Sequence, residues 1–301
     1  MSELRPPTPP AARSGAVLAL LSLTACEPGI LPSQGLVGKG DTQILIDSLA
    51  IMLVIVVPTI LATLAFAWWF RSSNLNARRR PDFVYSGKIE MITWSIPLMT
   101  IMLLGGVAWI GSHKLDPAEP LASHDPVLNV QVVSLDWKWL FIYPDQNIAS
   151  VNRLVIPVGT PVHFTLTSAS VMNAFFVPQL GSMIYTMNGM STQLNLNADE
   201  PGTFLGMSSH FSGDGFADMH FIVKAVPADA FDAWVTQVRG SGSVLDLPGY
   251  AELAKPSQAV PPATYRSVDP KLFERIVEET ALGPNKAHSG EEGPPRGRTG
   301  G

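Results

Sequence analysis

The sequence has very little cysteine and little charge. Cys26 is the only cysteine among 301 residues, so no disulfide bond can form within the chain. Charged residues make up 15% of the chain and the formal net charge is −5, so there is no excess of basic residues for binding nucleic acid. Hydrophobic residues make up 46%, and where they lie decides between a large core and membrane spans.

Two long runs contain no charged residue at all, residues 48–70 and residues 91–112. Each run exceeds the roughly 20 residues that a helix needs to cross a bilayer core. Pro58 and Pro97 interrupt them, but membrane helices tolerate proline. We therefore predict a transmembrane helical hairpin over residues 44–112. The alternative is a pair of buried helices in a soluble protein, which rarely need runs of this length.

The loop between the two runs, residues 71–88, is strongly basic. It carries Arg71, Arg78, Arg79, Arg80 and Lys88 against a single acid, Asp82. Because positively charged loops stay on the cytoplasmic side, we expect this loop to be cytoplasmic. Residues 26–43 and everything after Ser112 then lie in the periplasm.

The N-terminus has the shape of a secretory signal peptide, residues 1–25. Arg5 and Arg13 precede a short apolar stretch that ends in Leu-Thr-Ala-Cys at residues 23–26. This ending resembles a bacterial lipobox, in which lipid is attached to the cysteine, here Cys26. We expect a multi-pass lipoprotein of the bacterial inner membrane, and the alternative is a signal-like segment with a chance cysteine.

The region 116–226 has the pattern of a β-rich domain. Apolar and polar residues alternate in short segments separated by turn residues such as Asn188-Gly189. The expected strands are residues 128–135, 136–143, 161–168, 192–198, 202–209 and 219–226. This pattern predicts an antiparallel β-sandwich. We expect Trp137 and Trp139 to share one face of a strand and to pack in the core.

The residues after the sandwich have a helical pattern. We expect a C-terminal helical extension over residues 227–283, with helices at 227–239 and 247–253 and a third that Asp269-Pro270 opens. The polar tail, residues 284–301, is predicted to be disordered.

The order of these segments and several motifs resemble subunit II of the haem–copper respiratory oxidases. The motifs are GKIEMITWSIP (87–97), DWKWLFIYPDQ (136–146), SVMNAFFVPQLGS (170–182) and EPGTFLGMSSHFSG (200–213). The resemblance covers roughly residues 15 to 283. It implies a cupredoxin-like Greek-key sandwich in the periplasm.

That family has a branch with a binuclear copper centre and a branch without it. At the positions of the two copper-ligating histidines this chain has Asn173 and Phe216. Ser208 and Ser212 stand at the positions of the two cysteines, and His210 stands at the position of the carboxylate residue. Among the ligand positions, only the methionine is kept, as Met219. Copper electron-transfer sites need thiolate ligands, so we expect no metal here. His210, His220 and Met219 could in principle hold one copper, but neighbours in a strand point to opposite faces.

The resemblance therefore implies the quinol oxidase branch, whose reductant enters from the bilayer instead of from cytochrome c. The complex would oxidise ubiquinol, reduce oxygen to water and move protons across the membrane. Its haems and copper are expected in subunit I, with smaller membrane subunits as further partners, and this chain would carry no cofactor and no catalytic residue. The alternatives are a cytochrome c oxidase subunit II and a free-standing membrane lipoprotein that serves as a scaffold.

Glu90 is the one candidate for active chemistry in this chain. The family has a glutamate at this place, at the mouth of a proton channel that leads into subunit I. The alternative is that Glu90 only stabilises the helix, because an acid near a helix N-terminus gains up to about 1 kcal/mol.

Overall fold

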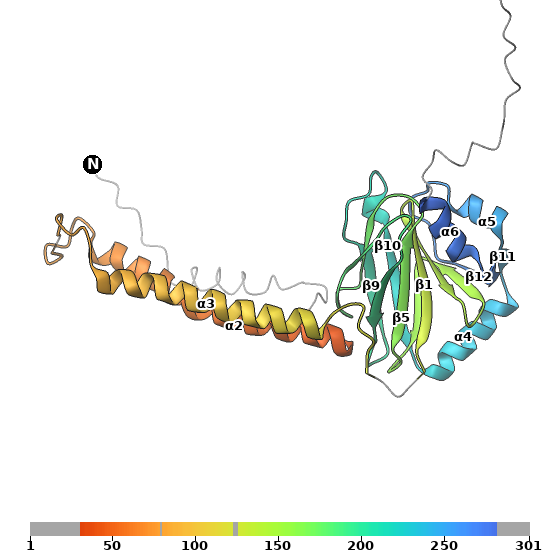
Figure 1. The fold of residues 1–301 in the computed structure, drawn as a ribbon, viewed down its shortest axis with the longest axis horizontal. Coiled ribbons are helices and arrows are strands. Elements are labelled where there is room, and N and C mark those ends of the chain that lie inside the picture. Colours follow the sequence, from red (N-terminus) through yellow and green to blue (C-terminus); the bar gives the residue numbers. More distant parts are fainter. Residues whose placement is uncertain (1–30, 79, 123–125, 282–301) are drawn as a thin grey trace, which may run out of the picture.

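The computed structural model describes residues 31–281, apart from 79 and 123–125, and shows a long helical hairpin joined to a β-sandwich (Figure 1). This agrees with the predicted class of fold, two apolar helices followed by a mostly β domain with helices at its end. The predicted signal peptide, the lipidation site Cys26 and the tail 284–301 lie outside the described residues.

The hairpin consists of α2 (Gly35–Trp69) and α3 (Gly87–Lys114), which run side by side (Figure 1). Both helices are long and apolar enough to cross a membrane, and neither apolar window is buried within the chain. The first helix starts at Gly35 and not near the predicted residue 44. At 35 residues it is about 52 Å long, more than a bilayer core requires. Its first turns are therefore available to contact the β domain.

The sandwich is built from a seven-stranded and a five-stranded sheet. The larger sheet has the order β11 (Ser243–Leu245), β12 (Ala263–Val268), β3 (Ile148–Val151), β2 (Lys138–Tyr143), β1 (Leu128–Leu135), β5 (Val162–Ser168) and β8 (Thr192–Leu196). The smaller sheet has the order β4 (Arg153–Pro157), β10 (His220–Val226), β9 (Gly202–Ser208), β6 (Asn173–Phe176) and β7 (Ile184–Thr186).

The prediction of purely antiparallel pairing is wrong for three pairs of strands. β1 pairs with β5, β4 with β10 and β11 with β12 in parallel. In each pair the chain makes a long connection before it returns, as parallel neighbours require. Between β1 and β5, for example, it enters the smaller sheet as β4.

Strand β2 shows how the domain buries both faces of its larger sheet. Trp139, Phe141 and Tyr143 point into the main core between the sheets. Leu140 and Ile142 point the other way, into a second cluster that the C-terminal segment covers. All six residues of β2 are buried because each face has its own cover.

Trp137 does not share a strand face with Trp139, contrary to the prediction. It lies in the turn between β1 and β2 and has a φ of 61°, in the left-handed region. This turn takes the Trp137 ring out of the alternation of β2 and places it against Gly213 and Gly215.

The C-terminal segment contains three helices, α4 (Ala228–Gly240), α5 (Leu247–Leu253) and α6 (Leu272–Ala281). The prediction of a purely helical segment is wrong, because β11 and β12 also belong to this segment. These two strands extend the larger sheet beyond β3. Asp269 accepts a hydrogen bond from the Lys271 N–H at 2.9 Å, which supports the predicted start of the last helix. Helices α5 and α6 lie on the side of the domain away from the hairpin (Figure 1).

Candidate functional site

The positions that correspond to copper ligands converge where β6, β9 and β10 meet. Asn173 begins β6 and is 1% exposed, Ser208 ends β9 and is 4% exposed, and Met219 immediately precedes β10 and is 1% exposed. The residues from Ser209 to Met219, called here the 209–219 loop, connect β9 to β10. A short 3₁₀ turn at Phe216–Asp218 closes this loop.

Hydrogen bonds hold these buried side chains together. Ser208 Oγ lies 3.1 Å from Asn173 Oδ1 and 3.1 Å from the His210 carbonyl, so its proton can be donated to either oxygen. The Ser208 N–H donates to the Met219 carbonyl at 3.1 Å, and Ser212 Oγ lies 3.7 Å from Met219 Sδ. Asn173, Ser208, Ser212 and Met219 therefore form one compact polar cluster.

Three other candidates point away from this cluster. The His210 ring packs edge-on against Tyr185, with ring centroids 5.9 Å apart. The Phe216 ring packs against the exposed Phe211, with centroids 5.6 Å apart. His220 is exposed whereas its neighbour Met219 is buried, as the alternation of a strand requires. The structure therefore does not bring together His210, His220 and Met219, the three residues considered above as ligands of a single copper ion.

The cluster does not fit a thiolate-bridged copper centre. Its donor atoms are an amide oxygen, two hydroxyl groups and one thioether, and hard hydroxyl oxygens do not replace the soft thiolates that such centres use. Among the described residues, no group of three or more histidine, cysteine, aspartate or glutamate side chains is placed to hold a metal ion.

Trp137 and Lys138 connect the 209–219 loop to the C-terminal segment. The Trp137 indole N–H donates to the Ser212 carbonyl at 3.1 Å. The buried Lys138 ammonium donates to the Lys255 carbonyl at 2.7 Å and to Ser257 Oγ at 2.5 Å. Burial lowers the pKa of Lys138, and the charge of Asp136 opposes this shift. Lys138 was not singled out from the sequence, where it reads as one charge within a β segment.

Glu90 lies in the first turn of α3, and its side chain is exposed. Its backbone N–H donates to the Ser86 carbonyl at 3.0 Å, and its own carbonyl accepts from Thr93 Oγ1 at 3.0 Å. Within the described part of the chain, the Glu90 carboxylate makes no ion pair. Its position agrees both with a proton-accepting group and with a helix-stabilising acid.

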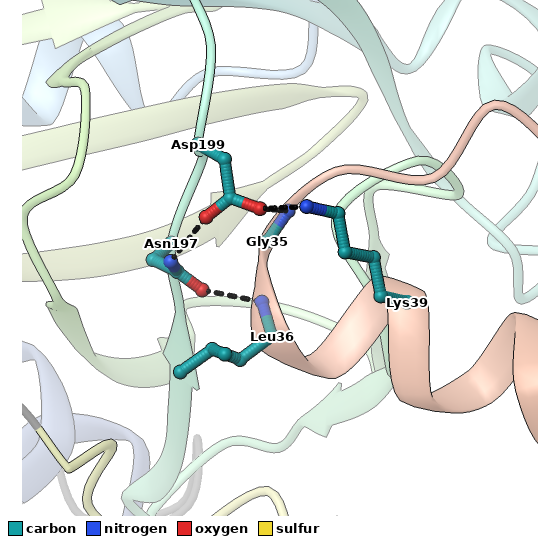
Figure 2. Close-up of polar contacts among 5 residues, drawn as sticks. All are labelled: Gly35, Leu36, Lys39, Asn197 and Asp199. Carbon is teal, nitrogen blue, oxygen red and sulfur yellow. Dashed lines mark hydrogen bonds and ion pairs between the residues drawn. The ribbon is translucent and has the colours of Figure 1, made fainter.

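The contact between the hairpin and the β domain was not predicted (Figure 2). Asp199 accepts hydrogen bonds from the Gly35 N–H at 3.1 Å and from the Lys39 ammonium at 2.6 Å. Asn197 Oδ1 accepts from the Leu36 N–H at 2.9 Å. These side chains satisfy N–H groups that a helix start leaves without partners, and α2 has no side-chain cap of its own.

Two glycines allow this close approach. A Cβ at Gly35 would lie 2.0 Å from the Asn197 carbonyl oxygen, and one at Gly38 would lie 2.8 Å from the Gln179 carbonyl oxygen. The Gly-x-x-Gly spacing at 35–38 was therefore the available signal in the sequence, although it does not identify the partner.

Comparisons with known proteins match both the β domain and the C-terminal segment to described families. Residues 144–226 match the family model "Cytochrome C oxidase subunit II, periplasmic domain", and residues 239–280 match "COX Aromatic Rich Motif". The second match contains α5, β12 and most of α6, the segment that covers the outer face of the larger sheet.

Curated relatives cover most of the chain. "Ubiquinol oxidase subunit 2" of Acetobacter aceti is 48% identical over 268 residues, which are 88% of this chain and 87% of that protein. "Cytochrome bo(3) ubiquinol oxidase subunit 2" of Pseudomonas aeruginosa is 46% identical, over 85% of this chain and 78% of that protein. "Quinol oxidase subunit 2" of Bacillus cereus is 34% identical, over 85% and 90%.

Among solved structures, the periplasmic domain of cytochrome oxidase subunit II from Bradyrhizobium japonicum is similar. It is 26% identical with a TM-score of 0.35, over 36% of this chain and 91% of that chain.

The sandwich and the matched family model define a cupredoxin-like subunit II of a multisubunit respiratory oxidase. Within that class, the chain belongs to the ubiquinol oxidase subunit 2 family, the branch whose members fit a copper-free subunit. The two span-capable helices and the periplasmic-type domain fit a protein of the inner membrane.

Proposed function

We propose that this chain is the non-redox subunit of a complex that oxidises ubiquinol, reduces oxygen to water and moves protons across the membrane. The relatives named for ubiquinol oxidation support ubiquinol as the reductant. The haems and the copper belong to subunit I in this proposal. Smaller membrane subunits complete the complex.

The proposal depends on one observation: Ser208 and Ser212 place hydroxyl groups where a copper centre would need thiolates. Both side chains are engaged with neighbours, Ser208 with Asn173 and Ser212 with Met219. An electron from a water-soluble donor such as cytochrome c therefore has no acceptor in this domain. A quinol in the bilayer delivers its electrons to subunit I directly, without passing through this chain.

Substrate specificity tests the electron route. The complex is purified with its subunits, and oxygen consumption is measured with a short-chain ubiquinol and with reduced cytochrome c. We expect turnover with ubiquinol only. We also expect no near-infrared absorption of a mixed-valence copper pair. Oxidation of cytochrome c at a comparable rate would overturn the proposal.

Glu90 is proposed to take up protons at the cytoplasmic end of α3 and pass them to subunit I. An exposed carboxylate at the start of a membrane helix can exchange protons with water, and acids at such positions are functional candidates. The Glu90→Gln variant removes the titrating group and keeps the size, so we expect turnover to fall by about 100-fold or more with normal assembly, as is typical of a lost proton-transfer group.

Asp82→Asn is the matched control, because it also removes one acid from the same end of the hairpin. Its turnover should equal that of the wild type. Equal turnover of the Glu90→Gln variant would leave Glu90 with only a helix-stabilising role.

Lipidation at Cys26 and the periplasmic position of the outer domain complete the proposal. The Cys26→Ala variant should lose incorporation of labelled palmitate, and it should remain in the membrane because α2 and α3 anchor the chain. Labelled palmitate on the variant would disprove modification at this cysteine. Protease added to intact spheroplasts should cleave the β domain and spare the loop at 70–86.

A further inference from the structure

An open cavity of about 320 Å³ lies between the two hairpin helices, lined by Gly40 to Asp47 of α2 and by the last turns of α3. This end of the hairpin is the one next to the β domain (Figure 1). Three polar side chains line the cavity, Gln43 and Asp47 from α2 and Lys114 from α3. The remaining wall is mainly apolar and includes Ile44 and Ile110. This end of the hairpin lies at the expected depth of lipid headgroups, because the charge-free run of α3 ends at Ser112.

A second cavity, of about 490 Å³, lies deeper between the same helices. Its walls are aliphatic side chains such as Val54, Ile96 and Leu103, with Thr100 as the one hydroxyl. The Thr100 hydroxyl donates to the Ile96 carbonyl within its own helix, at 2.8 Å. The deeper cavity therefore presents no unsatisfied polar group from its lining.

The two cavities follow one another along the same faces of α2 and α3, and together they are called here the groove. On α2 the lining passes from Asp47 in the outer cavity to Ile51 in the deeper one, and on α3 from Val107 to Leu103. Each step is four residues, which is about one helical turn on the same face. The groove therefore has a polar outer end followed by an apolar stretch, the pattern of an amphiphile.

The charges at the outer end define the headgroup. Asp47 accepts a hydrogen bond from Gln43 Nε2 at 2.8 Å, and this bond leaves its negative charge unneutralised. Lys114 makes no ion pair with any described residue, although it lines the same cavity as Asp47. A ligand with one cation and one anion is complementary to this pair. A purely anionic headgroup would be repelled by Asp47, and a neutral quinol head would leave both charges unpaired.

We propose that this groove binds an amine-bearing zwitterionic phospholipid, phosphatidylethanolamine, from the outer leaflet. Its ammonium group faces Asp47, its phosphate faces Lys114, and one acyl chain occupies the deeper cavity. The inference rests on the membrane-spanning hairpin and outward-facing β domain of the proposed function. It does not depend on which quinol the complex oxidises.

Lipid retention by the intact complex tests the proposal. The complex is purified, washed extensively with detergent, and its retained phospholipids are identified and counted by native mass spectrometry. The wild type should retain phosphatidylethanolamine in preference to phosphatidylglycerol. The double variant Asp47→Asn with Lys114→Gln should reduce this retention at least tenfold. The matched control, Asp82→Asn with Lys88→Gln at the other end of the hairpin, should retain lipid as the wild type does.

A single variant gives a sharper test of the charge argument. Asp47→Asn leaves Lys114 as the only charge, so the preference should shift from phosphatidylethanolamine towards phosphatidylglycerol. Unchanged lipid counts in the double variant, or no shift of preference in the single variant, would overturn the proposal. Ubiquinol oxidation measured on the same samples reports separately on the proposed function, so the two can fail independently.

Discussion

The outer domain and the membrane hairpin use large apolar side chains in opposite ways. In the domain, Trp139, Phe175 and Phe221 are at most 1% exposed and lie in contact between the two sheets. In the hairpin, Trp94 and Trp109 are 74% and 68% exposed. The domain thus buries its apolar surface within itself, whereas the hairpin depends on lipid and on other subunits to cover the same kind of surface.

The largest difference is expected when one tryptophan is removed from each region. Trp139→Ala takes away a ring that packs edge-on against Phe175 and Phe221, with centroids 5.5 and 5.6 Å apart. The free energy of unfolding of the domain should fall by about 3–5 kcal/mol. Trp94→Ala should change it by less than about 0.5 kcal/mol, because that ring has no partner in the core.

Urea unfolding of the full chain in detergent, followed by the circular dichroism of the β domain, measures both variants. A similar loss for the two would mean that the hairpin contributes to the domain's core, contrary to the contrast drawn above.

Adding one methyl group should lower the stability of the domain and raise the stability of the hairpin helices. A Cβ at Gly206 in β9 would lie 2.2 Å from the Phe221 ring, so Gly206→Ala should destabilise the domain by about 1–3 kcal/mol. A Cβ at Gly105 in α3 meets no atom within 4 Å, and alanine favours helix over glycine by up to about 1 kcal/mol. The melting temperature of the domain should therefore fall in Gly206→Ala. The melting temperature of the hairpin helices should rise in Gly105→Ala. A stable Gly206→Ala variant would show that the Phe221 ring can move aside.

The domain should also respond to alkaline pH through a buried tyrosine, a residue type that the helices α2 and α3 do not contain. Burial raises the pKa of Tyr143, whose hydroxyl donates to the Val155 carbonyl at 3.0 Å and accepts from the Val155 N–H at 2.9 Å. Because the unfolded chain loses this proton near pH 10 and the folded chain holds it, stability is fully present below pH 10 and falls above it. The loss is about 1.4 kcal/mol for each pH unit above 10.

Tyr143→Phe is the control for this prediction. The variant is less stable at neutral pH because the Val155 groups lose their partner, but its stability should fall less steeply between pH 10 and 11. Parallel pH profiles of wild type and variant would show that Tyr143 is not the responsible group.

Local pattern in the sequence determined much of this structure, and long-range contacts determined the rest. The segments at 128–135 and 247–253 are predicted with the observed bounds. Apolar residues alternate in the first segment, and Asp246 followed by Pro248 is a helix-start signal for the second. Strands β11 and β12 were missed since they are short, only partly buried and edge-like, and β3 alone joins them to the main sheet. Trp137 was misplaced because nothing local announces a left-handed tryptophan in a turn.

Some residues of the candidate sites could be located from sequence motifs, and others depend on long-range contacts. The resemblance located Asn173, Ser208 and Met219 before the structure brought them together, since those positions follow from matching motifs. It did not reveal that Lys138 joins the C-terminal segment to β2, because that contact spans 117 residues. The pairing of Gly35 with Asp199, 164 residues apart, is equally invisible to local pattern.

The smallest effect is expected where the two regions meet, at the start of α2 (Figure 2). Asp199→Ala removes the acceptor for the Gly35 N–H and the ion pair with the Lys39 ammonium, whose side chain is 60% exposed. A lost cap and an exposed ion pair together should cost about 1 kcal/mol, so hydrogen exchange of the amides at 35–36 should speed up by about fivefold. Glu200→Ala is the control, because no described hydrogen bond joins that neighbouring acid to α2. If exchange speeds up equally in both variants, the cause is the loss of negative charge near the helix start. If it changes only in Asp199→Ala, a specific contact joins the start of the hairpin to the domain, in addition to the cover that lipid and other subunits give the rest of α2.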